Sequence, residues 1–380
     1  MRGNIEQRSK GSWRLRYDGP LESTGRRKQI TETVKGTKKD AEKVLRERLA
    51  AIENGGFVPK HLETVAEYME RWLDTYATTN TTPRTQEGYR GNIQRYINPA
   101  IGRVALQSLT GQQIQGMYAQ MTGRGLSART VLHTHRVLNT ALRHAVKWGI
   151  LVRNVTETTT PPKPQSTEME MWDESATDRF IDAITEHRFR DFYQLALVTG
   201  MRRSELAGLR WENVDLVTGR LSVVSTRQRI IGRGILEDQP KTRRSRRSIA
   251  LGPETVELLH EIRGNQIEQK LTAGGAWQDT GYVLTQADGR PMNPVQVSQE
   301  FTKIVRKAEL PHLSLHGLRH AHATQLLADN VNPKIVSERL GHSNIATTMD
   351  VYSHVLPAMQ EAAALSGERV LGRKRTSHWD

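Results

Sequence analysis

The sequence predicts a multidomain chain: a small β-sheet plus helix (α+β), an all-α unit of four helices, and a mainly α unit with a small antiparallel β-sheet. Its 380 residues allow two or three domains at about 100–200 residues each. Apolar residues alternate with period two near the start and recur with a helical period further on. A polar Thr/Pro-rich stretch then interrupts the helical pattern. The predicted parts are residues 1–57, 62–157, 158–171 (a linker), 172–356 and 357–380 (a tail).

The first part has the pattern of a three-stranded sheet followed by one helix. Apolar and polar side chains alternate at residues 13–17 and 29–34, and a further strand is expected at 4–8. Thr37 is a helix N-cap, and the glycine pair at 55–56 ends the helix. The helix can therefore pack on one face of the sheet.

The other face of this sheet carries Arg14 and Arg16. A three-stranded basic sheet is narrow enough to enter a major groove. Aromatic side chains alternate with the basic ones on these short strands, which favours DNA binding. The alternative is a solvated basic sheet.

The second part has helical periodicity throughout. Helices are expected at residues 64–78, 83–97, 110–122 and 127–148. The last helix is amphipathic and has a basic exposed side. The candidate DNA contacts on that side are Arg129, Arg136 and Lys147.

The composition narrows the function classes. The 55 Lys and Arg outnumber the 41 Asp and Glu, and the formal net charge of +14 favours nucleic acid as a partner. Residues 1–57 and 58–160 are each net +6, and residues 161–380 only +2. The absence of cysteine excludes disulfides, thiolate zinc sites and cysteine nucleophiles. Without a signal-peptide pattern or a membrane-spanning apolar run, we expect a cytoplasmic protein with no membrane partner.

The third part, which also shows a strand pair around 220–251, contains four distinctive groups of residues. In the first group, Gly200 ends an apolar helix and Arg202 begins the next, where its guanidinium can meet a phosphate. Glu205, three residues on, can steady that guanidinium. A capped helix with a surface ion pair is the alternative.

The second group, residues 239–248, is a basic hairpin tip between strand-like runs. It contains Lys241, Arg243 and Arg244. Such a charge run is either a solvated loop or a nucleic-acid contact.

The third group begins a helix capped by Ser314. His316 and Arg319 are three residues apart and therefore share a face. His316 and His320 also suggest a metal site. A zincin-type site, however, needs Glu directly after the first His, where this chain has Gly317. We expect no metal.

The fourth group is His342 with Tyr352 ten residues later. An isolated Tyr is usually a packing residue. Taken in order, however, the four groups resemble the active-site signature of the tyrosine recombinases, the lambda-type integrase family. The residues that carry this resemblance are Arg202, Lys241, His316, Arg319, His342 and Tyr352.

The resemblance covers about residues 170–356 and implies the family's catalytic fold there. Residues 62–155 resemble the family's helical core-binding domain, and residues 1–57 resemble the small arm-binding domains of phage and conjugative-element integrases. Gly317 stands where many members carry an acidic residue.

The resemblance also implies roles for the charged residues. Arg202 and Arg319 would neutralise the phosphodiester under attack without a metal, as two guanidiniums can. His316 and His342 would donate hydrogen bonds and manage protons.

Tyr352 would be the nucleophile and form a 3′-phosphotyrosyl link. Lys241 would protonate the leaving 5′ oxygen, a task that suits an ammonium better than an always-charged guanidinium. Because one phosphodiester is exchanged for another, no ATP and no cofactor is required.

The implied partners are double-stranded DNA, at core and arm attachment sites, and other copies of the chain in a homotetramer that exchanges the tail. An excisionase and a DNA-bending host protein are candidate accessory partners. Three alternatives stay open. A type IB topoisomerase needs no arm-binding domain, a resolvase-type recombinase resembles only the last two segments, and a catalytically inert DNA-binding regulator would not need Tyr352 with all its partners.

Overall fold

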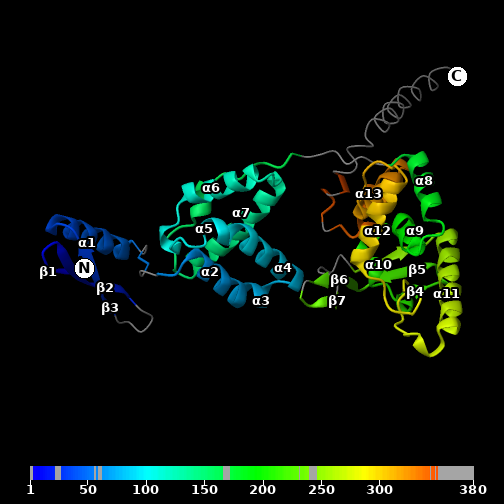
Figure 1. Cartoon of the computed structure of the whole chain (residues 1–380), viewed down its shortest axis with the longest axis horizontal. Helices are drawn as coiled ribbons and strands as arrows, with labels where there is room; N and C mark the ends of the chain where they lie inside the picture. The colour runs from blue at the N-terminus through cyan, green and yellow to red at the C-terminus, as the bar shows by residue number, and fades with distance from the viewer. Residues whose placement is uncertain are drawn as a thin grey trace, which may run out of the picture. The chain divides into compact units, whose positions relative to one another are not determined.

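The computed structural model describes residues 3–21, 27–54, 57–58, 62–165, 172–230, 232–238, 246–342, 344–346 and 348–349. The chain divides into two units, Met1–Thr167 and Glu168–Asp380, whose helices and strands are coloured along the chain in Figure 1. The finer predicted boundaries stay predictions. The predicted site residues that lie outside the described ranges are Lys241, Arg243, Arg244 and Tyr352, together with the tail at 357–380.

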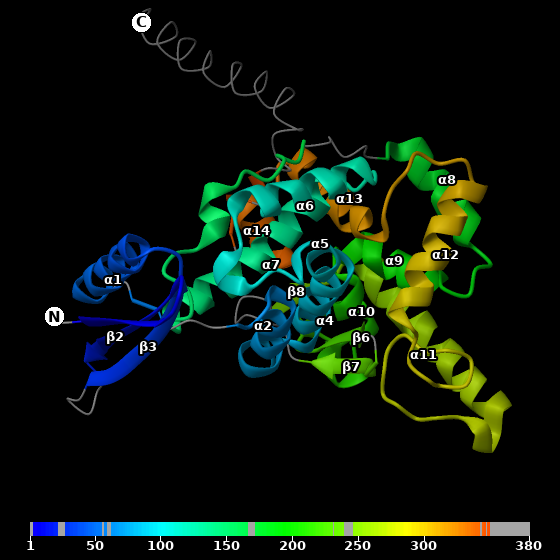
Figure 2. The ribbon, with the colours of Figure 1, turned by 60° about the vertical axis from the view of Figure 1, so that its left-hand side comes forward.

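The N-terminal residues form the predicted sheet and helix. The antiparallel sheet has the order β1 (Gly3–Ser9), β2 (Ser12–Leu21) and β3 (Arg27–Lys35). Trp13 pairs with Val34, so apolar side chains of neighbouring strands share one face. Helix α1 (Lys38–Glu53) packs on that face (Figure 2), and Thr37 caps it as predicted.

The next residues fold into the four predicted helices. The first two run a few residues beyond their predicted ends, and each contains a π-helical turn. They comprise α2 (Val65–Trp72), η1 (Leu73–Ala77) and α3 (Thr78–Asn80), then α4 (Pro83–Asn92), η2 (Ile93–Ile97) and α5 (Asn98–Ile101). The other two are α6 (Gly111–Gly123) and α7 (Ala128–Lys147). One hydrophobic core joins them, and in it the Tyr68 hydroxyl donates to the Ala141 carbonyl at 2.6 Å.

The second unit combines helices with two small sheets. Its main helices are α8 (Glu174–Ile184), α9 (Arg190–Thr199), α10 (Arg203–Ala207), α11 (Pro253–Ala273), α12 (Pro294–Lys307), α13 (Leu315–Ala328) and α14 (Pro333–Leu340). One sheet has the order β4 (Val214–Asp215), β5 (Arg220–Val223) and β8 (Arg247–Ala250), and the other is a hairpin of β6 (Thr226–Ile230) and β7 (Gly234–Asp238). The predicted strand pair is present as β5 and β8. The hairpin of β6 and β7 between them was not predicted, and Arg247 and Ser248 of the predicted hairpin tip belong to β8.

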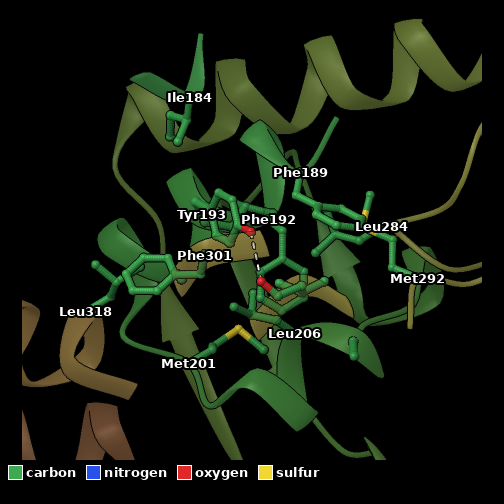
Figure 3. Close-up of a cluster of buried hydrophobic side chains, with 14 of the residues drawn as sticks. Ile184, Phe189, Phe192, Tyr193, Met201, Leu206, Leu284, Met292, Phe301 and Leu318 are labelled. Carbon is green, nitrogen blue, oxygen red and sulfur yellow. Dashed lines mark hydrogen bonds between the residues drawn. The ribbon is translucent and has the colours of Figure 1, made fainter. Parts of the chain in front are cut away.

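The core of the second unit holds the helices that carry the candidate site. Phe192, Tyr193 and Phe301 are buried together (Figure 3). The Tyr193 hydroxyl of α9 donates to the Val297 carbonyl of α12 at 2.8 Å. Leu318 of α13 belongs to the same cluster, so the neighbour of Arg319 anchors α13 in this core.

Among the helices described, none has the length and apolarity that a membrane crossing requires.

Candidate active site

The first charged group lies where α9 ends and α10 begins. Gly200 ends α9 in the left-handed conformation, with φ at 63°, and Arg202 is the N-cap of α10. Glu205 accepts from the Arg202 backbone N–H at 2.9 Å and from its Nη1 at 2.7 Å. The Arg202 side chain keeps 34% of its surface exposed and Glu205 keeps 2%. Arg202 therefore presents its charge to solvent, and the buried Glu205 carboxylate fixes its position.

Three guanidiniums converge on the C-terminal end of α14. Each of three consecutive backbone carbonyls accepts a hydrogen bond from one guanidinium. The Arg339 carbonyl accepts from Arg247, the Leu340 carbonyl from Arg319, and the Gly341 carbonyl from Arg202. The last carbonyls of a helix lack intrahelical partners and carry partial negative charge, so they attract cations. Arg319 also donates to the Gly200 carbonyl at 2.8 Å, which ties the end of α14 to the end of α9.

Glu205 lies between two of these arginines. Arg247 donates from Nη1 to Oε1 at 3.2 Å and from Nη2 to Oε2 at 2.9 Å. Burial raises the pKa of the Glu205 carboxyl, but the hydrogen bonds and charge of Arg247 and the charge of Arg202 outweigh burial and hold this pKa below its usual range. The carboxylate is therefore ionised, and three guanidiniums with one carboxylate leave a net charge of +2.

Arg319 is almost fully buried, with 3% of its surface exposed. Burial and then the charge of Arg202 lower the pKa of its guanidinium to about 9. Arg319 thus stays protonated at neutral pH, although like charges surround it. A phosphate that arrives at the cluster relieves this repulsion.

His316 and His342 carry neutral rings beside the cluster. Although His316 is exposed, partial desolvation followed by the charges of His320 and Arg319 lowers its pKa to about 4. Desolvation and then Arg319 lower the pKa of His342 to about 4, and its Nδ1 lies 2.8 Å from the Thr348 hydroxyl. Because an adjacent anion favours imidazolium, bound phosphate raises both pKa values.

Among the described residues, the suggested metal site at His316 and His320 gains no further ligand. Their rings meet edge to face with centroids 4.9 Å apart. Within the ranges that the structure describes, no three His, Asp or Glu side chains gather as metal ligands. Gly317 is buried, and a Cβ there would lie 2.4 Å from Leu313 Cδ1. Leu313 therefore fills the space where an acidic side chain would begin.

The sequence pattern did not predict Arg247 as a site residue, because Arg247 lies within the basic run at 239–248. The structure instead makes Arg247 the first residue of β8, on the same face as the buried Ile249. The period-two spacing from Ile249 was the available signal. His322 and Arg339 were also missed: Arg339 Nε donates to His322 Nε2 at 3.2 Å.

The predicted DNA contacts in the first unit lie on solvent-facing surfaces. Arg14 and Arg16 lie on the sheet face opposite α1, where each approaches Glu6, at 3.7 and 4.0 Å. Arg129, Arg136 and Lys147 are exposed on α7. Each predicted set therefore shares one face of its element, and in these sets only Arg14 is half-buried.

Comparison with known proteins supplies the family. The Phage integrase family model matches residues 171–359, and the model of the phage integrase N-terminal SAM-like domain matches residues 64–121. The XerC-like tyrosine recombinase of Caldanaerobacter subterraneus subsp. tengcongensis is 31% identical over 349 residues, which cover 86% of this chain and 88% of that protein. The ICEBs1 integrase of Bacillus subtilis is 24% identical over 287 residues, 75% of this chain and 77% of that one.

Solved structures share the fold. The Tn1549 transposon integrase in complex with transposon right end DNA gives a TM-score of 0.68 at 22% identity and covers 79% of this chain and 99% of that one. A lambda integrase tetramer bound to a Holliday junction gives 0.58 at 19% identity and covers 92% and 94%. Family match and fold together define an enzyme of site-specific DNA recombination. More particularly, the chain belongs to the phage integrase family of tyrosine recombinases.

Proposed function

We propose that this chain integrates or excises a mobile DNA element by cleaving and rejoining strands through a 3′-phosphotyrosyl link to Tyr352. The observation that carries the proposal is the net +2 cluster of Arg202, Arg319 and Arg247 around Glu205. A phosphodiester carries one negative charge, and the pentacoordinate transition state carries two. Preorganised charge of +2 therefore matches the transition state better than the ground state.

In the proposed step, Tyr352 Oη forms a bond to phosphorus while the bond from phosphorus to the 5′ oxygen breaks. The phenol, whose ordinary pKa is about 10, passes its proton to a base, and the neutral rings of His316 and His342 suit that task. The Lys241 ammonium protonates the 5′ oxygen. Rejoining reverses the step with the 5′-hydroxyl as nucleophile, so neither ATP nor a cofactor is consumed.

Double-stranded DNA is the proposed partner at two kinds of attachment site. The proposed contacts are Arg14 and Arg16 at arm sites, Arg129, Arg136 and Lys147 at core sites, and Arg243 and Arg244 beside the scissile phosphate. In support, the similar Tn1549 integrase was solved with transposon DNA and the lambda integrase as a tetramer on a Holliday junction. We propose that four copies of this chain likewise assemble on paired sites in the host cytoplasm and exchange the tail, with an excisionase and a DNA-bending host protein as accessory partners.

A nicked suicide substrate tests the function, because loss of the short 5′-hydroxyl fragment traps any covalent link. We expect the wild-type chain to form a protein–DNA adduct that survives a denaturing gel. Tyr352→Phe removes one oxygen and no positive charge, so it should bind DNA normally and form no adduct. Tyr89→Phe, which removes the same oxygen in α4, is the matched control. An adduct from Tyr352→Phe would overturn the assignment, and none from the wild-type chain would favour the inert regulator.

Lys241→Ala separates the general acid from the rest of the site. We expect slow cleavage of an ordinary substrate, because the 5′ oxygen leaves without a proton. A 5′-phosphorothiolate substrate should restore the rate, since sulfur leaves without protonation. If the rate stays low on the phosphorothiolate, the acid is another group, with Arg243 or His316 the next candidates.

A further inference from the structure

Arg247, like Arg319, is a guanidinium of the cluster that solvent hardly reaches. Its side chain is 6% exposed, against 34% for Arg202. Its Nε donates to the Arg339 carbonyl, and both terminal nitrogens donate to Glu205. With its Nε and both terminal nitrogens engaged in this way, Arg247 is placed to act through Glu205 and the end of α14.

The Glu205 carboxylate is fully occupied only because Arg247 is present. A carboxylate has about four acceptor positions. On Oε1, two are filled by Nη1 of Arg202 at 2.7 Å and Nη1 of Arg247 at 3.2 Å. On Oε2, two are filled by the Arg202 backbone N–H and by Nη2 of Arg247, each at 2.9 Å. Arg202 thus donates only one terminal nitrogen to the carboxylate.

Removal of Arg247 would change both geometry and charge. Two acceptor positions on Glu205 would open, and a guanidinium and a carboxylate prefer a two-pronged pair. Arg202 would then turn onto Glu205 and withdraw from the surface. The net charge of the cluster would fall from +2 to +1, below the charge of the transition state that it faces.

We propose that Arg247 is a positioning residue for strand cleavage: it occupies half of the Glu205 carboxylate, so that Arg202 keeps an edge for the scissile phosphate. Arg247 also begins β8 six residues after Lys241, and its carbonyl partner Arg339 precedes His342 by three residues. It therefore joins the strand that follows Lys241 in the chain to the helix end that precedes His342. The inference rests on the proposed function of this site.

Single-turnover cleavage of the nicked substrate by the full chain tests the inference. We expect Arg247→Met to cleave about 10–100-fold more slowly, because a misplacement of about 1 Å in a group that positions the reacting centre can cost about 100-fold. The cleavage rate of Arg247→Lys should lie between those of the wild-type chain and Arg247→Met, because lysine keeps the charge but cannot bridge both oxygens of Glu205. Arg220→Met, an exposed arginine on the neighbouring strand β5, is the matched control and should cleave normally.

Two readouts separate positioning from a merely structural role. First, adding Glu205→Gln to Arg247→Met removes the carboxylate that captures Arg202 and restores a net charge of +2, so the double variant should cleave faster than Arg247→Met alone. Second, a methylphosphonate at the scissile position, which lacks the negative charge, should reduce the defect of Arg247→Met. A structural role predicts neither effect.

The outcomes are distinct. Cleavage by Arg247→Met at nearly the wild-type rate, or a double variant no faster than Arg247→Met, overturns the inference while leaving the function intact. No adduct from the wild-type chain overturns the function itself. Hydrogen exchange of α9 and α14 shows whether each variant folds. If Arg247→Met does not fold, Arg247→Lys is tested on the methylphosphonate substrate. A cleavage defect of Arg247→Lys that is as large there as on the ordinary substrate overturns the inference.

Discussion

Gly200→Ala is expected to destabilise the second unit more than an alanine substitution at a left-handed glycine ordinarily does. Gly200 has φ at 63°, and a Cβ there would lie 2.6 Å from His322 Cδ2 and 2.7 Å from Leu340 Cδ2. Its carbonyl also accepts from Arg319. The substitution therefore strains the backbone, crowds α13 and α14, and disturbs the guanidinium cluster in one change.

The expected magnitude follows from two contributions. Alanine in the left-handed region costs about 1–2 kcal/mol, and overpacking a closely packed contact costs about 1–3 kcal/mol. Their sum predicts a loss of about 2–5 kcal/mol in the free energy of unfolding. Gly232→Ala is the matched control: its φ is 76°, and no atom lies within 4 Å of the added Cβ, so it should lose only the first contribution. The lower entropy of the unfolded alanine chain affects both variants and cancels in the comparison.

Native-state hydrogen exchange in increasing urea, read by mass spectrometry on α9 and α13, measures these losses within the second unit. The difference between the two variants should be about 1–3 kcal/mol, with slower cleavage only for Gly200→Ala. Equal losses for the two variants would show that His322 and Leu340 move aside freely and would refute the packing argument.

Three further outcomes are expected. Burial and the charge of Arg339 lower the pKa of His322 to about 4, so the unfolded chain takes up a proton between about pH 6.5 and 4 that the folded chain does not. The free energy of unfolding should therefore fall as the pH drops through that window. Urea denaturation at pH 7 and 4.5 should show a smaller fall for His322→Gln than for the wild-type chain. Deletion of residues 1–57, which carry +6 of the net charge, should weaken arm-site binding and lower its salt dependence in filter-binding assays while core-site cleavage survives; equal arm binding would contradict this. Truncation after His354 should leave DNA binding intact but prevent tetramers on paired sites in sedimentation, and normal tetramers with normal strand exchange would count against tail exchange.

The parts of the molecule that the sequence predicted well depend on local patterns. Period-two alternation at residues 13–17 and 29–34 set the register that puts apolar side chains on one face of the sheet. The pairing of Arg202 with Glu205 follows from their spacing of three residues at a helix start. Such features need no knowledge of distant segments.

The parts that the sequence did not predict depend on distant contacts. Arg247 meets Glu205 from 42 residues away and the Arg339 carbonyl from 92 residues away. Its neighbours in the chain are basic, which is typical of a solvated loop and gave no sign that Arg247 faces inward. Its burial depends on a carboxylate and a helix end that only the folded unit brings together.

The cluster contains guanidiniums, and the proposed general acid is an ammonium, because the two roles require different pKa values. Burial and neighbouring charges lower the pKa of Arg319 to about 9, and it still keeps its proton at neutral pH. An ammonium begins from about 10.4, so the same surroundings would remove its proton near neutrality and the cluster would lose charge. The proposed general acid has the opposite requirement, since Lys241 must release a proton at the moment the 5′ oxygen departs. A buried site that must stay cationic throughout the reaction is therefore built from arginines, and the one group that must give up a proton is a lysine.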